Sequence, residues 1–161
     1  ASWGGQGGGQ VGDGFTMTLD NSTLEPVGNE GTGGQPGSRG VNINVTNGSQ
    51  FNPFFIVNAV SLDIDGTSSA TFGGGGNPVN ISTINLTLGS TLAFLAETPA
   101  QFTNEHLGKV TVDGTPAVAG VNIQIDPFNG AAGSVITVIP EPSSAALLSL
   151  AGLALVFRRR K

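Results

Sequence analysis

The feature that most constrains the fold is an alternation of apolar and polar residues that recurs along the chain and is followed each time by a turn. Period-two alternation is typical of half-buried strands, and the Gly, Asn, Ser and Thr that follow are typical turn residues. The turns lie at positions 21, 48, 66, 89 and 114, at intervals of 27, 18, 23 and 25 residues. A recurrence at this spacing indicates one supersecondary unit per repeat.

We therefore predict an all-β fold for residues 15–139, organised as a right-handed parallel β-helix, or solenoid, of about five irregular coils. A β-sandwich or jelly roll is the alternative, because it also has alternating strands separated by turns. Residues 99–108 are expected to form a loop or a short helical turn, and residues 120–139 two closing strands. The side chains expected to point inward are those of Leu19, Ile43, Val45, Leu62, Ile64, Ile84, Leu86, Val110 and Val112.

Composition supports a β fold and excludes several classes of protein. Gly accounts for 26 of 161 residues and charged residues for 11%, which argues against a helical protein. Residues 1–14 are so rich in Gly that we expect a flexible N-terminal segment. All eleven acids and only two of the six basic residues precede Pro142, so the body is acidic and nucleic-acid binding is not expected. The chain has no Cys, which excludes disulfides and thiolate chemistry.

Candidate chemical sites in the body are few. Asp63 and Asp65 place two carboxylates on one face of a strand, and such oxygen ligands suit weak calcium binding, although the full EF-hand loop is absent. Two surface carboxylates are the alternative. His106 is the single His, and we interpret it as a loop residue beside Glu105. A zinc site would need carboxylates for most of its ligands, which is unusual. We predict no catalytic residue, no enzymatic activity and no cofactor apart from this calcium.

The last 22 residues have three parts with different physical roles. Pro140 and Pro142 flank Glu141 and cannot extend a helix or a central strand, so they hold an accessible peptide. Residues 143–157 carry no charge and are rich in Ala and Leu. We expect them to form one transmembrane helix, although it is shorter than the ~20 residues usual for a crossing. The chain ends with a membrane-stop cluster of cations, which is retained on the cytoplasmic side: Arg158, Arg159, Arg160 and Lys161.

This order of parts over residues 140–161 resembles the PEP-CTERM sorting domain of exported bacterial proteins. The resemblance implies cleavage near Pro140-Glu141-Pro142 by an exosortase-like membrane protease, after transient anchoring in the inner membrane. It also implies a final location at the cell surface or outside the cell, in an organism that makes exopolysaccharide or a biofilm matrix. The body more loosely resembles Gly-, Asn- and Thr-rich β-solenoid repeat regions.

We therefore expect a structural protein of the envelope or extracellular matrix, with the exosortase-like protease, the inner membrane and exopolysaccharide as partners. Two alternatives remain open. A carbohydrate-binding module needs an exposed row of aromatic residues beside polar groups. A polysaccharide-active β-helix enzyme needs acids that converge in a groove.

Overall fold

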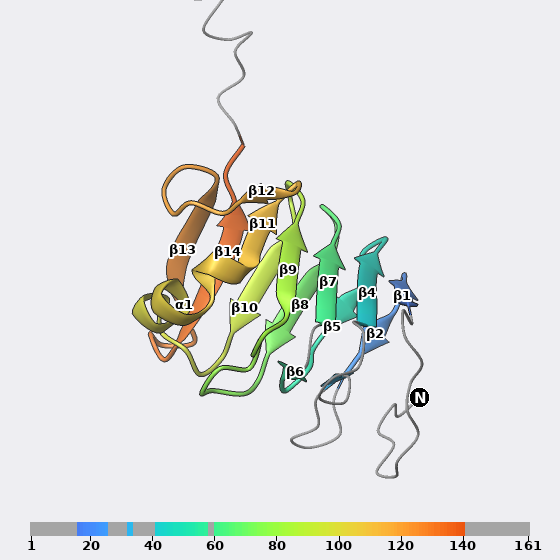
Figure 1. The fold of residues 1–161 in the computed structure, drawn as a ribbon, viewed down its shortest axis with the longest axis horizontal. Coiled ribbons are helices and arrows are strands. Elements are labelled where there is room, and N and C mark those ends of the chain that lie inside the picture. The colour runs from blue at the N-terminus through green and yellow to red at the C-terminus, as the bar shows by residue number, and fades with distance from the viewer. Residues whose placement is uncertain (1–15, 26–31, 34–40, 58–59, 141–161) are drawn as a thin grey trace, which may run out of the picture.

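The computed structural model describes residues 16–25, 32–33, 41–57 and 60–140 (Figure 1). Residues 1–14, predicted to be flexible, and the predicted helix over 143–157 lie outside this part of the chain. The strands are β1 (Thr16–Asp20), β2 (Thr23–Leu24), β3 (Thr32–Gly33), β4 (Val41–Thr46), β5 (Gln50–Phe51), β6 (Ile56–Val57), β7 (Val60–Ile64), β8 (Ser69–Phe72), β9 (Thr83–Leu86), β10 (Thr91–Phe94), β11 (Val110–Val112), β12 (Thr115–Pro116), β13 (Ile123–Phe128) and β14 (Gly133–Val138).

Helical structure is confined, among the described residues, to α1 (Pro99–Glu105) and the 3-10 helix η1 (Leu107–Lys109). The predicted all-β class and the short helical turn at 99–108 are both confirmed. No helix in the described ranges has the length and apolar character that a membrane crossing requires.

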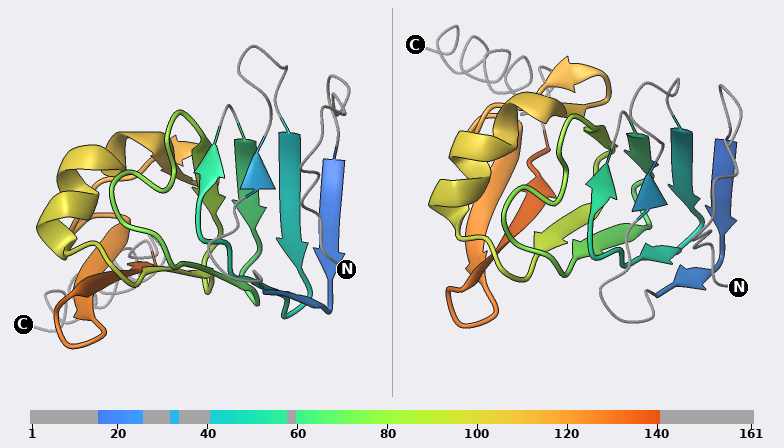
Figure 2. Two further views of the ribbon diagram at one scale, coloured as in Figure 1. Left: turned by 90° about the horizontal axis from the view of Figure 1, so that it is seen from below. Right: turned by 60° about the horizontal axis from the view of Figure 1, so that its bottom comes forward.

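Two six-stranded sheets face each other, and the chain passes alternately from one to the other. The first sheet has the order β1-β4-β7-β9-β11-β12, and the second β13-β14-β10-β8-β5-β2. All pairs from β1 to β11 and from β2 to β10 are parallel. A parallel pair of β3 and β6 lies on a third side. Each circuit thus adds one strand beside the strand of the previous circuit, as Figures 1 and 2 show.

The core consists of columns of apolar side chains, because the register places equivalent residues of successive circuits side by side. Leu19 pairs with Val45, Val45 with Ile64, Ile64 with Leu86, and Leu86 with Val112. All nine side chains predicted to point inward are buried, which confirms the register inferred from the alternation.

The corners between the two sheets share one backbone hydrogen bond, although their φ angles differ: Asn47 and Gly48 both have positive φ, whereas Gly89 alone does at the third corner. After β4, β7 and β9, the backbone amides of Ser49, Ser68 and Ser90 donate to the carbonyl oxygen three residues earlier, over 3.2, 3.1 and 2.9 Å. These corners stack closely: a Cβ added to Gly66 would overlap the carbonyl oxygen of Leu88 on the next circuit. Close backbone approach therefore requires glycine at position 66.

The series of parallel circuits ends at Gly114, where the sequence predicts another corner between the two sheets. Instead, Asp113 and Gly114 form a two-residue hairpin in which φ is 47° and 78°, as type I′ turns require. β12 consequently pairs antiparallel with β11, and the chain does not complete the predicted fifth coil. The two closing strands expected in 120–139 are confirmed as β13 and β14, an antiparallel pair at the end of the second sheet.

Candidate functional site

The described part of the chain ends where the Pro-Glu-Pro segment begins. β14 ends at Val138, and the backbone amide of Ile139 donates to the carbonyl oxygen of Asn122 over 2.9 Å. Pro140 follows, exposed to solvent and without an amide hydrogen to donate. Glu141, Pro142 and the basic cluster lie outside the described residues. In the described part of the chain, backbone hydrogen bonding thus reaches the residue directly before the predicted processing segment.

Asp65 serves as a cap of the corner between β7 and β8. Its Oδ1 accepts hydrogen bonds from the backbone amide and the hydroxyl of Thr67, both at 2.9 Å. Its Oδ2 accepts from the backbone amide of Asn47, on the previous circuit, at 2.8 Å. Partial desolvation raises the pKa of Asp65, but the hydrogen bonds from Ser68, Asn47 and Thr67 together outweigh it and lower the pKa to about 2.

Asp63 has different partners from Asp65. Its Oδ1 accepts from the side-chain amide of Asn85 on the next circuit at 3.2 Å, and its Oδ2 accepts from the hydroxyl of Ser61 at 3.4 Å. Neither carboxylate joins a group of three or more potential metal ligands among the described residues. The geometry gives both a role in joining circuits. Calcium binding here stays a prediction, measured as a rise in melting temperature at millimolar Ca²⁺.

Substitution of the corner carboxylate tests its structural role. We expect Asp65→Ala to lower the free energy of unfolding at pH 7 by about 1–2 kcal/mol, because hydrogen bonds to a partly exposed carboxylate are lost. The pKa of Asp65 is depressed on folding to about 2. Its contribution is therefore present above the unfolded pKa, near ~4, and is lost as the pH falls through the folded value.

Urea unfolding at pH 7 and pH 2 measures both effects. The difference between the unchanged protein and Asp65→Ala should shrink at the lower pH. Asp126→Ala is the matched control, because Asp126 is exposed and accepts from the side chain of Gln124 two residues away. A difference for Asp65→Ala that is as large at pH 2 as at pH 7 would contradict the capping role.

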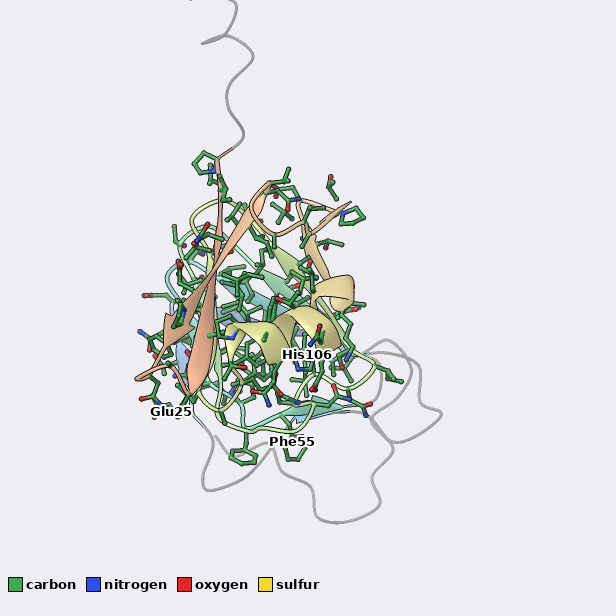
Figure 3. All side chains as sticks on the ribbon, turned by 90° about the vertical axis from the view of Figure 1, so that its left-hand side faces the viewer. Glu25, Phe55 and His106 are labelled. Atoms are coloured by element: carbon green, nitrogen blue, oxygen red, sulfur yellow. The ribbon has the colours of Figure 1, made fainter. Side chains whose placement is uncertain are left out.

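Glu97, which directly precedes the N-cap residue of α1, and His106, which directly follows the helix, form a buried pair; Figure 3 labels His106. His106 Nε2 lies 2.7 Å from Glu97 Oε2, and the side chains are 0% and 1% exposed. The ring of His106 stacks on Phe94, with centroids 5.3 Å apart and planes 7° apart, and Phe94 stacks on Phe72. His106, interpreted as a loop residue, does lie in the turn between α1 and η1, but its ring is buried and extends an aromatic column of the core.

The local sequence explains how α1 presents this histidine. Thr98 is the N-cap, and its hydroxyl and the side chain of Gln101 form a capping box. Pro99 occupies the first helical position, where no amide hydrogen is needed. Phe102 is buried, and its carbonyl oxygen accepts from the backbone amide of His106 over 2.8 Å. The helix thus begins directly after Glu97 and returns the chain to it at His106.

Burial governs the electrostatics of the pair. It raises the pKa of Glu97 and, together with the positive charge of Lys109, lowers the pKa of His106 to about 4. Glu97 Oε1 accepts from the backbone amide of Asn77 at 3.2 Å. Lys109 Nζ donates to Asn77 Oδ1 at 3.0 Å and lies 3.5 Å from His106 Nδ1. Burial also lowers the pKa of Lys109, against the opposing effect of Glu105 and Glu97.

Comparison with known proteins bears on the C-terminal segment. Residues 138–161 match the PEP-CTERM protein-sorting motif. No curated protein and no solved structure matched the chain. The match begins at Val138, the last residue of β14, so the motif follows the folded domain without a linker. The chain therefore carries a PEP-CTERM protein-sorting motif over residues 138–161, and this motif implies an exported protein that is membrane-anchored before an exosortase, a membrane protease, processes it.

Proposed function

We propose that the chain is a structural protein of the bacterial cell surface or extracellular matrix, released from the inner membrane by an exosortase-like protease. The observation that carries this proposal is the position of the motif. Among the described residues, the last backbone hydrogen bond along the chain is donated by Ile139, and the exposed Pro140 follows immediately. Cleavage near the motif therefore separates residues up to about 140 from the apolar and basic segments without cutting a strand.

A short right-handed parallel β-helix is the fold that we propose for this domain. Support comes from the parallel pairing of each circuit with the next from β1 to β11 and from the backbone hydrogen bond that recurs at the corners after β4, β7 and β9. Crossover connections between parallel strands of one sheet are right-handed in nearly all proteins. Such a rod, held by stacked side chains and continuous ladders, suits a structural role.

Two surface hollows are lined entirely by described residues. A hollow of about 620 Å³ between α1 and β13 has no acidic residue in its lining, and one of about 340 Å³ beside Pro140 has Asp113 alone. Neither hollow thus offers the pair of carboxyl groups that glycoside hydrolysis requires. A carbohydrate-binding module is the alternative to the structural role.

Fractionation of a host that has an exosortase and makes exopolysaccharide tests the proposal. We expect the processed protein to sediment with the extracellular matrix, and deletion of its gene to change matrix stiffness measured by rheology. The same fractions should release no reducing sugar from the host polysaccharide. Processed protein that is free in the medium, with an unchanged matrix, would contradict a structural role. Sugar release that depends on the chain would instead support an enzyme.

A further inference from the structure

Three potential metal ligands converge at the C-terminal end of α1. Glu97, Glu105 and His106 each offer one ligand atom, and these atoms all lie within 4.8 Å of one another. We propose that these three side chains bind one divalent zinc ion. Two carboxylates and one imidazole are an unusual set for zinc, but each donor is one that Zn²⁺ accepts, and a three-residue set leaves a coordination position for water.

The second, independent observation is that the buried donor atoms have no hydrogen-bond partner. His106 Nε2 and Glu97 Oε2 are both fully buried, and neither has such a partner among the described residues, although the two atoms lie 2.7 Å apart. Their contact therefore lacks the alignment of a hydrogen bond. An unpartnered buried polar atom is costly. Two donors bonded to one tetrahedral Zn²⁺ ion lie about 3.4 Å apart, so a shared ion satisfies both once the pair opens from 2.7 Å.

The ammonium group of Lys109 lies close to the proposed site and affects its affinity for zinc. Its ammonium group lies 3.5 Å from His106 Nδ1, on the side of the ring away from the proposed ion, and donates to Asn77 Oδ1. It therefore leaves the ligand atoms Nε2 and Oε2 free. Its charge nevertheless opposes a second cation beside the same two carboxylates. The positive charge of Lys109 therefore weakens zinc binding by repulsion. A variant with a neutral residue at position 109 should bind zinc more tightly.

Calorimetric titration of the full chain in detergent, stripped of metal and then given Zn²⁺, tests the site. We expect one equivalent to bind. Glu105 is exposed, so Glu105→Gln should leave the fold intact while weakening binding by about 10- to 100-fold or more, the range that even outer-shell partners produce. Lys109→Met should strengthen binding. Glu25→Gln is the matched control, since Glu25 is an exposed carboxylate directly after β2, which lies at the opposite end of the domain from α1 (Figure 1).

A spectroscopic readout separates this site from any other carboxylates that take up zinc. His106 is the single His of the chain, so selective ¹⁵N labelling of histidine reports on one imidazole. We expect the Nε2 signal to shift as zinc is added, and the melting temperature to rise with it. Zinc uptake without a change at Nε2, no uptake of one equivalent, or equal affinity for Glu105→Gln would each overturn the proposal.

Discussion

A chain with Glu141→Ala, expressed in a bacterium that has an exosortase, is expected to accumulate as unprocessed precursor, whereas the unchanged chain loses its C-terminal residues. The reason lies in the position of Glu141 within the matched motif, directly after the last described residue, Pro140. The prolines on either side disfavour a helix at this position, so we expect a protease to reach this carboxylate. Intact-mass spectrometry of the membrane and extracellular fractions measures the outcome.

Replacement of the basic cluster is a second test of whether the C-terminal motif acts as a sorting and processing signal. Arg158→Ser, Arg159→Ser and Arg160→Ser together remove three cations, each of which costs at least ~2.5 kcal/mol to bring into the bilayer on insertion scales. We expect this variant to be mislocalised and unprocessed. Glu25→Ala, a change on the folded domain, should be processed normally. Intact protein that ends in Lys161 and is found in the extracellular matrix would show that the motif is not a processing signal in this chain.

Gly66→Ala is expected to cost about 3 kcal/mol or more of unfolding free energy, at the upper end of overpacking effects. A methyl group at this position would overlap the backbone oxygen of Leu88 in the corner of the next circuit, and a backbone atom between two strands cannot move away as a side-chain end can. Equilibrium urea unfolding, followed by circular dichroism, measures the change.

Gly48→Ala is the matched control, because it lies at the corner of the previous circuit. Its φ is +75°, and an added Cβ meets nothing within 4 Å. We therefore expect only the conformational cost of a left-handed residue, about 1–2 kcal/mol. If Gly48→Ala were the more damaging change, backbone conformation rather than the stacking of corners would set the requirement for glycine.

The strands and the core register were predictable because their signal is local and periodic. Leu62 and Ile64 are separated by a polar residue, as are Ile84 and Leu86, and a strand must place both members of each pair on one face. The structure buries all four side chains. Period-two alternation therefore specifies which side chains enter the core without information about distant contacts.

The local sequence could not predict that the parallel circuits end at the Asp113-Gly114 hairpin. Asn47-Gly48 and Asp113-Gly114 are similar dipeptides, and their φ angles agree closely, at 56° and 75° against 47° and 78°. Yet the first leads into the second sheet, whereas the second returns Thr115 onto β11. The difference is set by what each following segment can pack against, which is a tertiary property.

The Glu97–His106 pair was missed for a related reason. Nothing in the spacing of these residues marks them as partners, since their contact depends on where α1 begins and on the aromatic column of Phe94 and Phe72 below the ring. A single His beside an exposed Glu105 reads as an ordinary surface pair. Burial, which only the folded arrangement provides, changes its chemistry.

The place of β14 links the completion of folding to the arrival of the sorting motif. β14 is the last described strand along the chain, yet it lies between β10 and β13 within the second sheet. The sheet therefore cannot close until residues up to Val138 have emerged on the outer side of the membrane. By then the motif, which begins at the same residue, stands at the bilayer. An exosortase-like protease in the membrane would therefore reach the motif at the stage of export when β14 can complete the sheet, so processing and folding become possible together.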